Sequence, residues 1–279
     1  MAKKKTLIGY KIAVLRGGGR MGIKQERLGQ ERLNNQGCLM RIIEYNNAHD
    51  VMVEFIDEYK AKIHTEYKHF LSGSVKNPYF RSVFGVGMIG EKYPMSINGK
   101  MTKEHFTWRG IISRCCDNKR KERYPAYDDV TCCEEWLNFD NFYEWLHSQP
   151  NFEKWLNGNR WAVDKDILVK GNKIYSPDTC CLVPENVNLL FTKRDKYRGD
   201  LPIGVRKNGN GFQAQWSNQL TNKKECSKNY STLEDAFYFG YKPYKENIIK
   251  QIAQIEFDNN NITEKCYNSM MNYKVEITD

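Results

Sequence analysis

Residues 161–190 read "WAVDKDILVKGNKIYSPDTCCLVPENVNLL", and the elements they encode decide the fold of the central part of the chain. The run "WAVDKDILV" predicts a strand, "KGN" a turn and "KIY" the start of a returning strand. "SPDTCCLVP" predicts an irregular corner, and Pro184 stands just ahead of a helix expected in "ENVNLLFTKRD". The sequence therefore predicts a β-hairpin followed by a helix.

A β-hairpin followed by a helix is the arrangement that one-metal nucleases need. A strand-end carboxylate and a helix Asn or His hold a divalent cation, and a hairpin His takes the proton from the attacking water. Asp164 and Asp166 are the candidate carboxylates here, and no histidine stands on the hairpin. Lys165 stands between them, and a lysine near an ionised aspartate stays protonated unless strongly desolvated, so as a cation it cannot accept that proton.

The segment "VDKDILVKGNKIYSPDTCCLVPENVN" resembles the HNH (His-Me finger) endonucleases of phages and mobile introns, whose hairpins read roughly "vDHidgnk…rpeNLrwvtpkeN". The resemblance covers about residues 100 to 195. It aligns Asp164 with the metal-binding aspartate, Lys165 with the general-base histidine and Thr179 with a structural or metal-binding asparagine. Asn188, or alternatively Asn186, aligns with the closing asparagine. The resemblance implies one Mg²⁺-class ion held by Asp164 and Asn188.

Three interpretations of this segment stay open. It is an HNH-derived domain that binds DNA or a protein without cutting, or an unrelated hairpin whose Asp-Lys-Asp is a charged surface turn. Alternatively it is an active variant, with metal on Asp164, Asp166 and Asn188 and with water or another group as base. His105 and His147 lie outside the hairpin, although folding could bring either one close.

A second module follows in "PIGVRKNGNGFQAQWSNQ" and the residues up to about 250. Phe212, Ala214 and Trp216 alternate with polar residues, which predicts a strand with one face on a helix and one face free for a DNA groove. The candidate nucleic-acid-binding residues are Lys193, Arg194, Lys196, Arg198, Arg206, Lys207, Gln213 and Gln215. An amphipathic sheet that meets a protein partner is the alternative.

This module resembles the ethylene-response-factor (APETALA-two type) DNA-binding domain, a three-stranded sheet backed by a helix. The matching positions are Gly204, Val205, Arg206, Phe212, Ala214, Tyr230, Thr232, Ala236 and Tyr238. The resemblance implies that Arg206 contacts bases. The family's first groove arginine is Ile203 here, and its Glu and second strand Arg are Gln215 and Ser217. We therefore expect sheet-to-groove binding to double-stranded DNA rather than sequence-specific readout.

Composition favours the same class of partner. The 279 residues carry a net charge of +9, which favours a polyanion. No window approaches 18 apolar residues, and the N-terminus lacks a long apolar core, so we expect neither a membrane span nor a secretory signal. Gly17, Gly19 and Gly22 fit GxGxxG, but the segment after them has too few apolar residues to cover a sheet, so no nucleotide cofactor is expected.

Cysteine spacing argues against a zinc module. Six of the nine cysteines form adjacent pairs and no CxxC occurs, so we expect no structural zinc, and reduced thiols in a cytoplasmic protein.

The predicted fold class is a multidomain α+β protein. The expected parts are a basic arm at 1–35, a small β-meander or barrel at 36–92, an HNH-like domain at 93–198, a sheet-plus-helix domain at 199–250 and a tail at 251–279. Strands are expected in "LMRIIEY", "VMVEFI" and "YKAKIHT", a hairpin at the Asn98-Gly99 turn, and helices in "FTWRGIISRCCDNK" and "CCEEWLNFDNFYEWLHSQ".

The expected function is that of a DNA-binding protein of HNH-endonuclease ancestry, encoded by a phage or mobile element. If active, it would nick or cleave DNA in the cytoplasm of a bacterial host. The alternative is a phage counter-defence protein that uses the same scaffold to bind a host immune complex, because the missing histidine and altered groove residues suit a scaffold released from chemistry.

Overall fold

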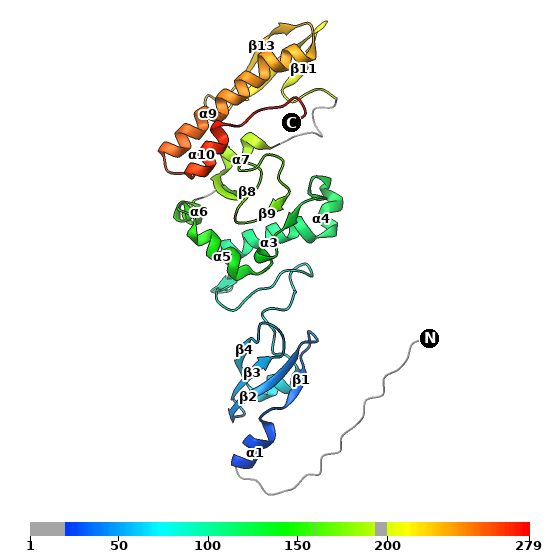
Figure 1. The fold of residues 1–279 in the computed structure, drawn as a ribbon, viewed down its shortest axis with the longest axis vertical. Coiled ribbons are helices and arrows are strands. Elements are labelled where there is room, and N and C mark those ends of the chain that lie inside the picture. The colour runs from blue at the N-terminus through cyan, green and yellow to red at the C-terminus, as the bar shows by residue number, and fades with distance from the viewer. Residues whose placement is uncertain (1–19, 159, 193–199) are drawn as a thin grey trace, which may run out of the picture. The chain divides into compact units, whose positions relative to one another are not determined.

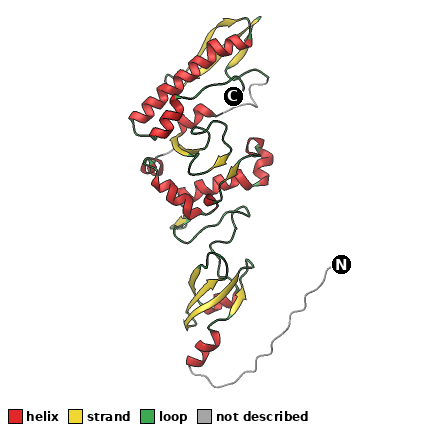
Figure 2. Ribbon diagram, viewed as in Figure 1, coloured by secondary structure: helices red, strands yellow, loops and turns green. Residues whose placement is uncertain are grey.

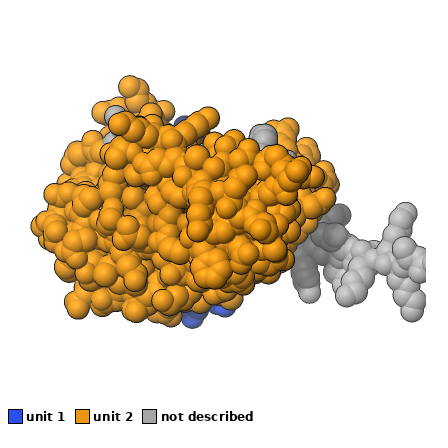
Figure 3. All heavy atoms as spheres, turned by 90° about the horizontal axis from the view of Figure 1, so that it is seen from above, with its two compact units in different colours: residues 1–80 blue, residues 81–279 orange. Residues whose placement is uncertain are grey.

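The computed structural model describes residues 20–158, 160–192 and 200–279. It contains both helices and sheets, so the predicted α+β class is confirmed (Figure 2). The chain divides into two compact units, residues 1–80 and 81–279 (Figure 3). In the part of the chain that the structure describes, no helix is long and apolar enough to cross a membrane.

The first unit is a four-stranded antiparallel sheet with strands in sequence order. Its elements are α1 (Arg20–Arg27), β1 (Glu31–Leu33), β2 (Leu39–Asn47), β3 (Asp50–Phe55), β4 (Lys62–Thr65) and α2 (Tyr67–Ser72). The three strands expected from alternation are confirmed, because β2, β3 and β4 fall on them. Val51, Val53 and Phe55 point to one face and form a core with Phe70 of α2. Edge strand β1 lies within the segment expected to be a basic arm.

The second unit begins with a helical half built on an aromatic core. Its elements are β5 (Ser96–Ile97), β6 (Lys100–Met101), α3 (Lys103–Cys116), α4 (Asn118–Arg123), η1 (Pro125–Tyr127), β7 (Thr131–Cys132), η2 (Glu135–Leu137), α5 (Phe139–Ser148) and α6 (Phe152–Asn157). The hairpin at Asn98-Gly99 is confirmed, with both residues at positive φ. The single helix expected across 132–149 is wrong. Helical structure is interrupted at Asn138, between η2 and α5. The Asn138 side chain accepts the N–H of Asp140 at 3.0 Å and so caps the start of α5.

The central segment differs from its predicted hairpin in both strands, and the strand expected over residues 161–169 ends at Asp164. It forms β8 (Trp161–Asp164), β9 (Ile174–Tyr175), β10 (Cys181–Pro184) and α7 (Glu185–Phe191). The expected return strand "KIY" is wrong, because β9 pairs in parallel with β7 and β8 pairs with β10. The irregular corner expected over "SPDTCCLVP" is wrong for its last four residues, which form β10. The helix expected after Pro184 is confirmed as α7.

The β8–β10 ribbon is buried on both faces. Val163 and Leu182, which stand opposite each other, belong to the aromatic core of α3 and α5. Cys181 and Val183 belong to a second core shared with the C-terminal elements. A strand covered on both sides needs no apolar–polar alternation, which is why β10 has no strand-like pattern of its own.

The C-terminal elements form a three-stranded antiparallel sheet covered on one face by helices (Figure 1). They are β11 (Val205–Asn208), β12 (Gly211–Asn218), β13 (Lys223–Tyr230), α8 (Leu233–Asp235), η4 (Ala236–Tyr241), α9 (Lys242–Asp258) and α10 (Glu264–Met271). Helix η4 approaches the sheet closely, since a Cβ on Gly240 would lie 2.7 Å from that of Ala214. Helix α10 packs beside α9, so the expected tail contributes to this core.

Candidate nucleic-acid interface and nuclease-like loop

Asp164 ends β8 and closes the turn that follows it. Its Oδ1 accepts the backbone N–H groups of Asp166 at 2.8 Å and of Ile167 at 2.9 Å. The residue is only 8% exposed, and burial raises the pKa of its carboxyl despite these two hydrogen bonds. One carboxylate oxygen is thus committed to the shape of the loop.

Lys165 is held as a buried cation. Its Nζ donates to Asp166 Oδ1 at 2.7 Å and to the Asn172 carbonyl at 2.9 Å. Asn172 returns a hydrogen bond from its Nδ2 to the Lys165 carbonyl, also at 2.9 Å. The side chain at the base position of the HNH pattern therefore fastens both ends of the 165–172 loop, and an ammonium in that role has no lone pair for a water proton.

The asparagines and threonine of the pattern have separate surroundings. Asn186 donates from Nδ2 to Glu256 Oε1 at 2.6 Å and so joins α7 to α9. Thr179 Oγ1 donates to the Ile174 carbonyl at 2.8 Å, in the segment between β9 and β10. Asn188, half-buried in α7, makes no side-chain hydrogen bond to another residue that the structure describes. The structure thus joins Asp164, Lys165 and Asp166 in one network, and Asn188 makes no hydrogen bond to it among the described residues.

The two candidate histidines belong to the helical core. His105 is buried in α3 against Trp108 and Phe139, with ring centroids 5.6 and 5.2 Å away. His147 stacks on Tyr143 at 3.9 Å and accepts or donates a 3.4 Å hydrogen bond with Glu104. Neither ring is hydrogen-bonded to a described residue of the 164–172 loop.

The donors at this loop do not fit a Mg²⁺ site. Magnesium prefers carboxylate oxygens with near-octahedral geometry. Asp164 commits one oxygen to two N–H groups, and the Asp166 carboxylate faces the Lys165 ammonium, which repels a second cation. Within residues 20–158, 160–192 and 200–279, no group of three His, Cys, Asp or Glu side chains could hold a metal ion.

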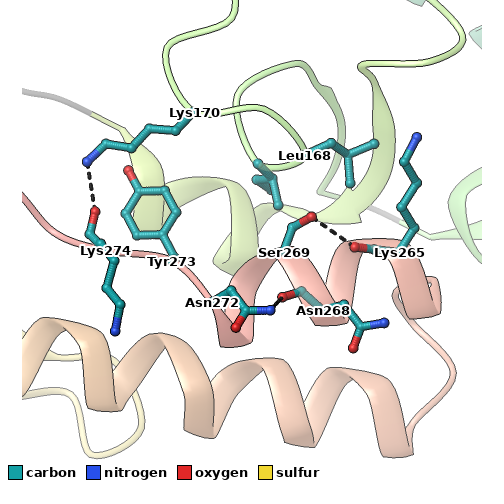
Figure 4. A pocket seen from close by; sticks show the side chains of 9 residues that line it. Leu168, Lys170, Lys265, Asn268, Ser269, Asn272, Tyr273 and Lys274 are labelled. Carbon is teal, nitrogen blue, oxygen red and sulfur yellow. Dashed lines mark hydrogen bonds between the residues drawn. The ribbon is translucent and has the colours of Figure 1, made fainter.

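A groove of about 580 Å³ opens beside the loop, between residues 167–170 and α10 (Figure 4). Its basic side chains are engaged or diverge. Lys170 Nζ donates to the Lys274 carbonyl and to Asp279 Oδ2, both at 2.7 Å, and Lys265 Nζ donates to the Asp178 carbonyl at 2.8 Å. The Lys274 side chain points away from Lys170 in the view of Figure 4. These cations do not converge on one ligand position.

One face of the β11–β13 sheet is covered by no element that the structure describes, and the register of the strands shows which residues lie on it. These outward residues are Arg206, Asn208, Gln213, Gln215, Ser217, Lys224, Cys226 and Asn229, with Arg206 and Asn229 each opposite Gln213, Gln215 opposite Cys226 and Ser217 opposite Lys224. The only carboxylate in these strands, Glu225, stands opposite Trp216 on the helix side and accepts its Nε1–H at 3.1 Å. We call this uncovered surface the outer face; it carries cations and amides and no acid.

Among the described contacts of the outer face, the charged group of Arg206 is hydrogen-bonded to a neighbouring side chain. Its Nη2 donates to Gln213 Oε1 at 2.7 Å, and Gln213 Nε2 donates to the Ser227 carbonyl at 2.6 Å. The guanidinium is therefore linked through one carboxamide to the backbone of β13.

Other predicted binding residues lie elsewhere or outside the described chain. Lys207 is exposed but stands opposite Phe212, so it leaves the sheet on the helix side. Lys193, Arg194, Lys196 and Arg198 lie outside the described residues. Sequence reasoning missed Lys224, although its place in the alternating "KKECSK" of β13 was a usable signal.

No protein-family model, no curated protein and no solved structure matches this chain. The functional argument rests on the geometry of the outer face and of the nuclease-like loop.

Proposed function

We propose that this protein binds double-stranded DNA through the outer face of β11–β13, and that its nuclease-like loop stabilises the fold without hydrolysing DNA. The sequence resemblance of residues 161–188 supports an origin from HNH endonucleases of phages or mobile elements. The observation that carries the proposal is the uncovered outer face, which has cations and carboxamides but no carboxylate.

The chemistry of the outer face suits a DNA groove. A major groove admits a β-ribbon, and arginine and carboxamide side chains match the hydrogen-bonding edges of bases. Lys224 and Arg206 supply positive charge for phosphates, which contribute most of the affinity of non-specific binding. Helix η4 and α9 leave this surface free because they cover the opposite one.

The absence of hydrolysis in the proposal follows from Lys165. Water activation needs a group that can accept a proton, and the Lys165 ammonium is ion-paired to Asp166 at 2.7 Å. Repulsion by this ammonium also disfavours a metal ion at the same carboxylates.

The test is fluorescence anisotropy with a labelled duplex of about two helical turns at low salt. The double substitution Arg206→Ala/Lys224→Ala should weaken binding at least about tenfold, because it removes two phosphate- or base-facing cations. Lys100→Ala is the matched control, since Lys100 is exposed at the β5–β6 turn with no side-chain partner among described residues. Equal affinity of the double variant and the control would refute the proposal.

The counter-defence alternative predicts the reverse result. DNA affinity would be weak even at low salt, and a host protein would stay bound to the chain at high salt. Phosphate-dominated binding, in contrast, falls steeply as salt rises.

A further inference from the structure

We propose that Gln213 is a specificity-determining residue: by fixing the Arg206 guanidinium on the outer face, it makes that arginine select guanine at one position of the bound duplex. The inference rests on the proposed DNA binding and deepens it. It also revises the expectation that the sheet binds without sequence-specific readout.

The Gln213 carboxamide can point only one way. The Ser227 carbonyl only accepts hydrogen bonds, so it must face the Gln213 NH₂ group, to which it lies at 2.6 Å. Gln213 Oε1 then faces Arg206 Nη2 at 2.7 Å, which only donates. Turning the amide over would break both contacts. Two consecutive hydrogen bonds, from Gln213 to the Ser227 carbonyl and from Arg206 to Gln213, therefore position the guanidinium relative to the β13 backbone.

Arg206 keeps enough donors for a base. A guanidinium has five N–H groups, and Gln213 takes one of them. Two parallel N–H groups can then meet O6 and N7 of guanine, which is the pairing that arginine geometry favours in the major groove. Because the side chain is ordered before binding, less conformational entropy is lost when it docks on one base edge.

The lysines of the same strands have no comparable brace. Lys224 has no side-chain hydrogen bond or ion pair with a described residue, and Lys228 only lies over the Tyr230 ring at 5.4 Å from its centroid. A lysine ammonium is a rotating point charge that suits phosphate, whereas a braced fork suits a base edge. On the outer face we therefore assign Lys224 to contacts with DNA phosphates and Arg206 to the edge of a base.

The experiment is selection of bound duplexes from a randomised library by the full chain, followed by sequencing. The position where Arg206→Ala loses guanine preference identifies the contact of Arg206. Gln213→Met, which has a similar length but no hydrogen bonds, should reduce the guanine preference at that same position about tenfold. The salt dependence of its binding to random duplex should match that of the wild type, because no charge is lost.

Gln251→Met is the matched control. It makes the same chemical change at an exposed residue of α9, away from the outer face, and should leave the guanine preference intact. Arg206→Lys is a second test that keeps the charge but removes the planar fork of donors. It should lose the guanine preference, while the salt dependence of binding to random duplex stays that of the wild type.

Retained guanine preference in Gln213→Met, or equal losses in Gln213→Met and Gln251→Met, would overturn the inference. So would a wild-type protein that binds random duplex tightly but selects no sequence, and that result would leave the proposed DNA binding standing. Failure of the wild type to bind any duplex would remove both.

Discussion

At Asp164 two opposing effects act on one carboxylate. Hydrogen bonds from Asp166 and Ile167 favour the anion, whereas burial favours the neutral acid and is the larger effect, so the pKa is raised. A carboxyl whose pKa is higher in the folded state than in the unfolded state stabilises the fold at low pH. That contribution is lost as pH rises through the folded-state pKa. Above that pKa the charge of Asp164 therefore destabilises the turn that its oxygen closes.

Asp164→Asn should be tolerated, because the amide oxygen can accept the same two N–H groups without a buried charge. We expect its thermal unfolding midpoint to equal or exceed that of the wild type at pH values above the raised pKa, with the difference shrinking as pH falls through that pKa toward the ordinary value of an aspartate. Asp164→Ala should lose about 1–3 kcal/mol of stability, since two buried N–H groups lose their acceptor. Equal destabilisation by both substitutions would show that the carboxylate itself is required.

Lys165→His should not produce a nuclease, even though it restores the HNH base residue. The donors around it do not form a metal site, and a single base does not supply the missing cation. The measurement is nicking of supercoiled plasmid with Mg²⁺ or Mn²⁺, for the wild type and for the variant. Nicking that disappears on Asp164→Ala would contradict our account of the loop.

At the scale of elements, the local pattern of apolar and polar residues identified the strands and helices that bury one face. Alternation found β2, β3 and β12, and the helix after Pro184 was readable from its proline. Strand β10 was missed because it is buried on both sides, and β9 was misassigned because its partner β7 lies far away in sequence. At the candidate site, Arg206 and Gln213 were each predicted from the sequence, but the hydrogen bond between them depends on cross-strand register, which no single strand encodes.

Close packing of η4 on the sheet should make Gly240→Ala destabilising. The new Cβ would meet that of Ala214 at 2.7 Å, and an overpacked contact of this kind loses about 1–3 kcal/mol. The unfolding midpoint should fall by several degrees in a thermal scan. Gly110→Ala is the matched control in α3, where nothing lies within 4 Å of the new Cβ, and it should be neutral or stabilising by about 1 kcal/mol. Similar midpoints for the two variants would contradict this packing.

At the scale of the whole molecule, two units with separate cores should unfold separately. Residues 1–80 bury their own cluster around Val53, and residues 81–279 have their own cores. Val53→Ala should therefore lower the midpoint of one calorimetric transition, by about 1–3 kcal/mol of stability, and leave the other unchanged. A single transition that shifts as a whole would indicate that the units unfold together.

A cysteine on the outer face can report directly whether DNA binds there. Of the nine cysteines, all within described residues, Cys226 alone is exposed, and it stands opposite Gln215 on the proposed DNA surface. The measurement is the rate of Cys226 alkylation by N-ethylmaleimide, read by peptide mass spectrometry with and without saturating duplex, with half-buried Cys38 as internal reference. Our account predicts that duplex slows Cys226 alkylation about tenfold or more and leaves Cys38 unchanged. Bound duplex with an unaltered Cys226 rate would contradict DNA binding at this face.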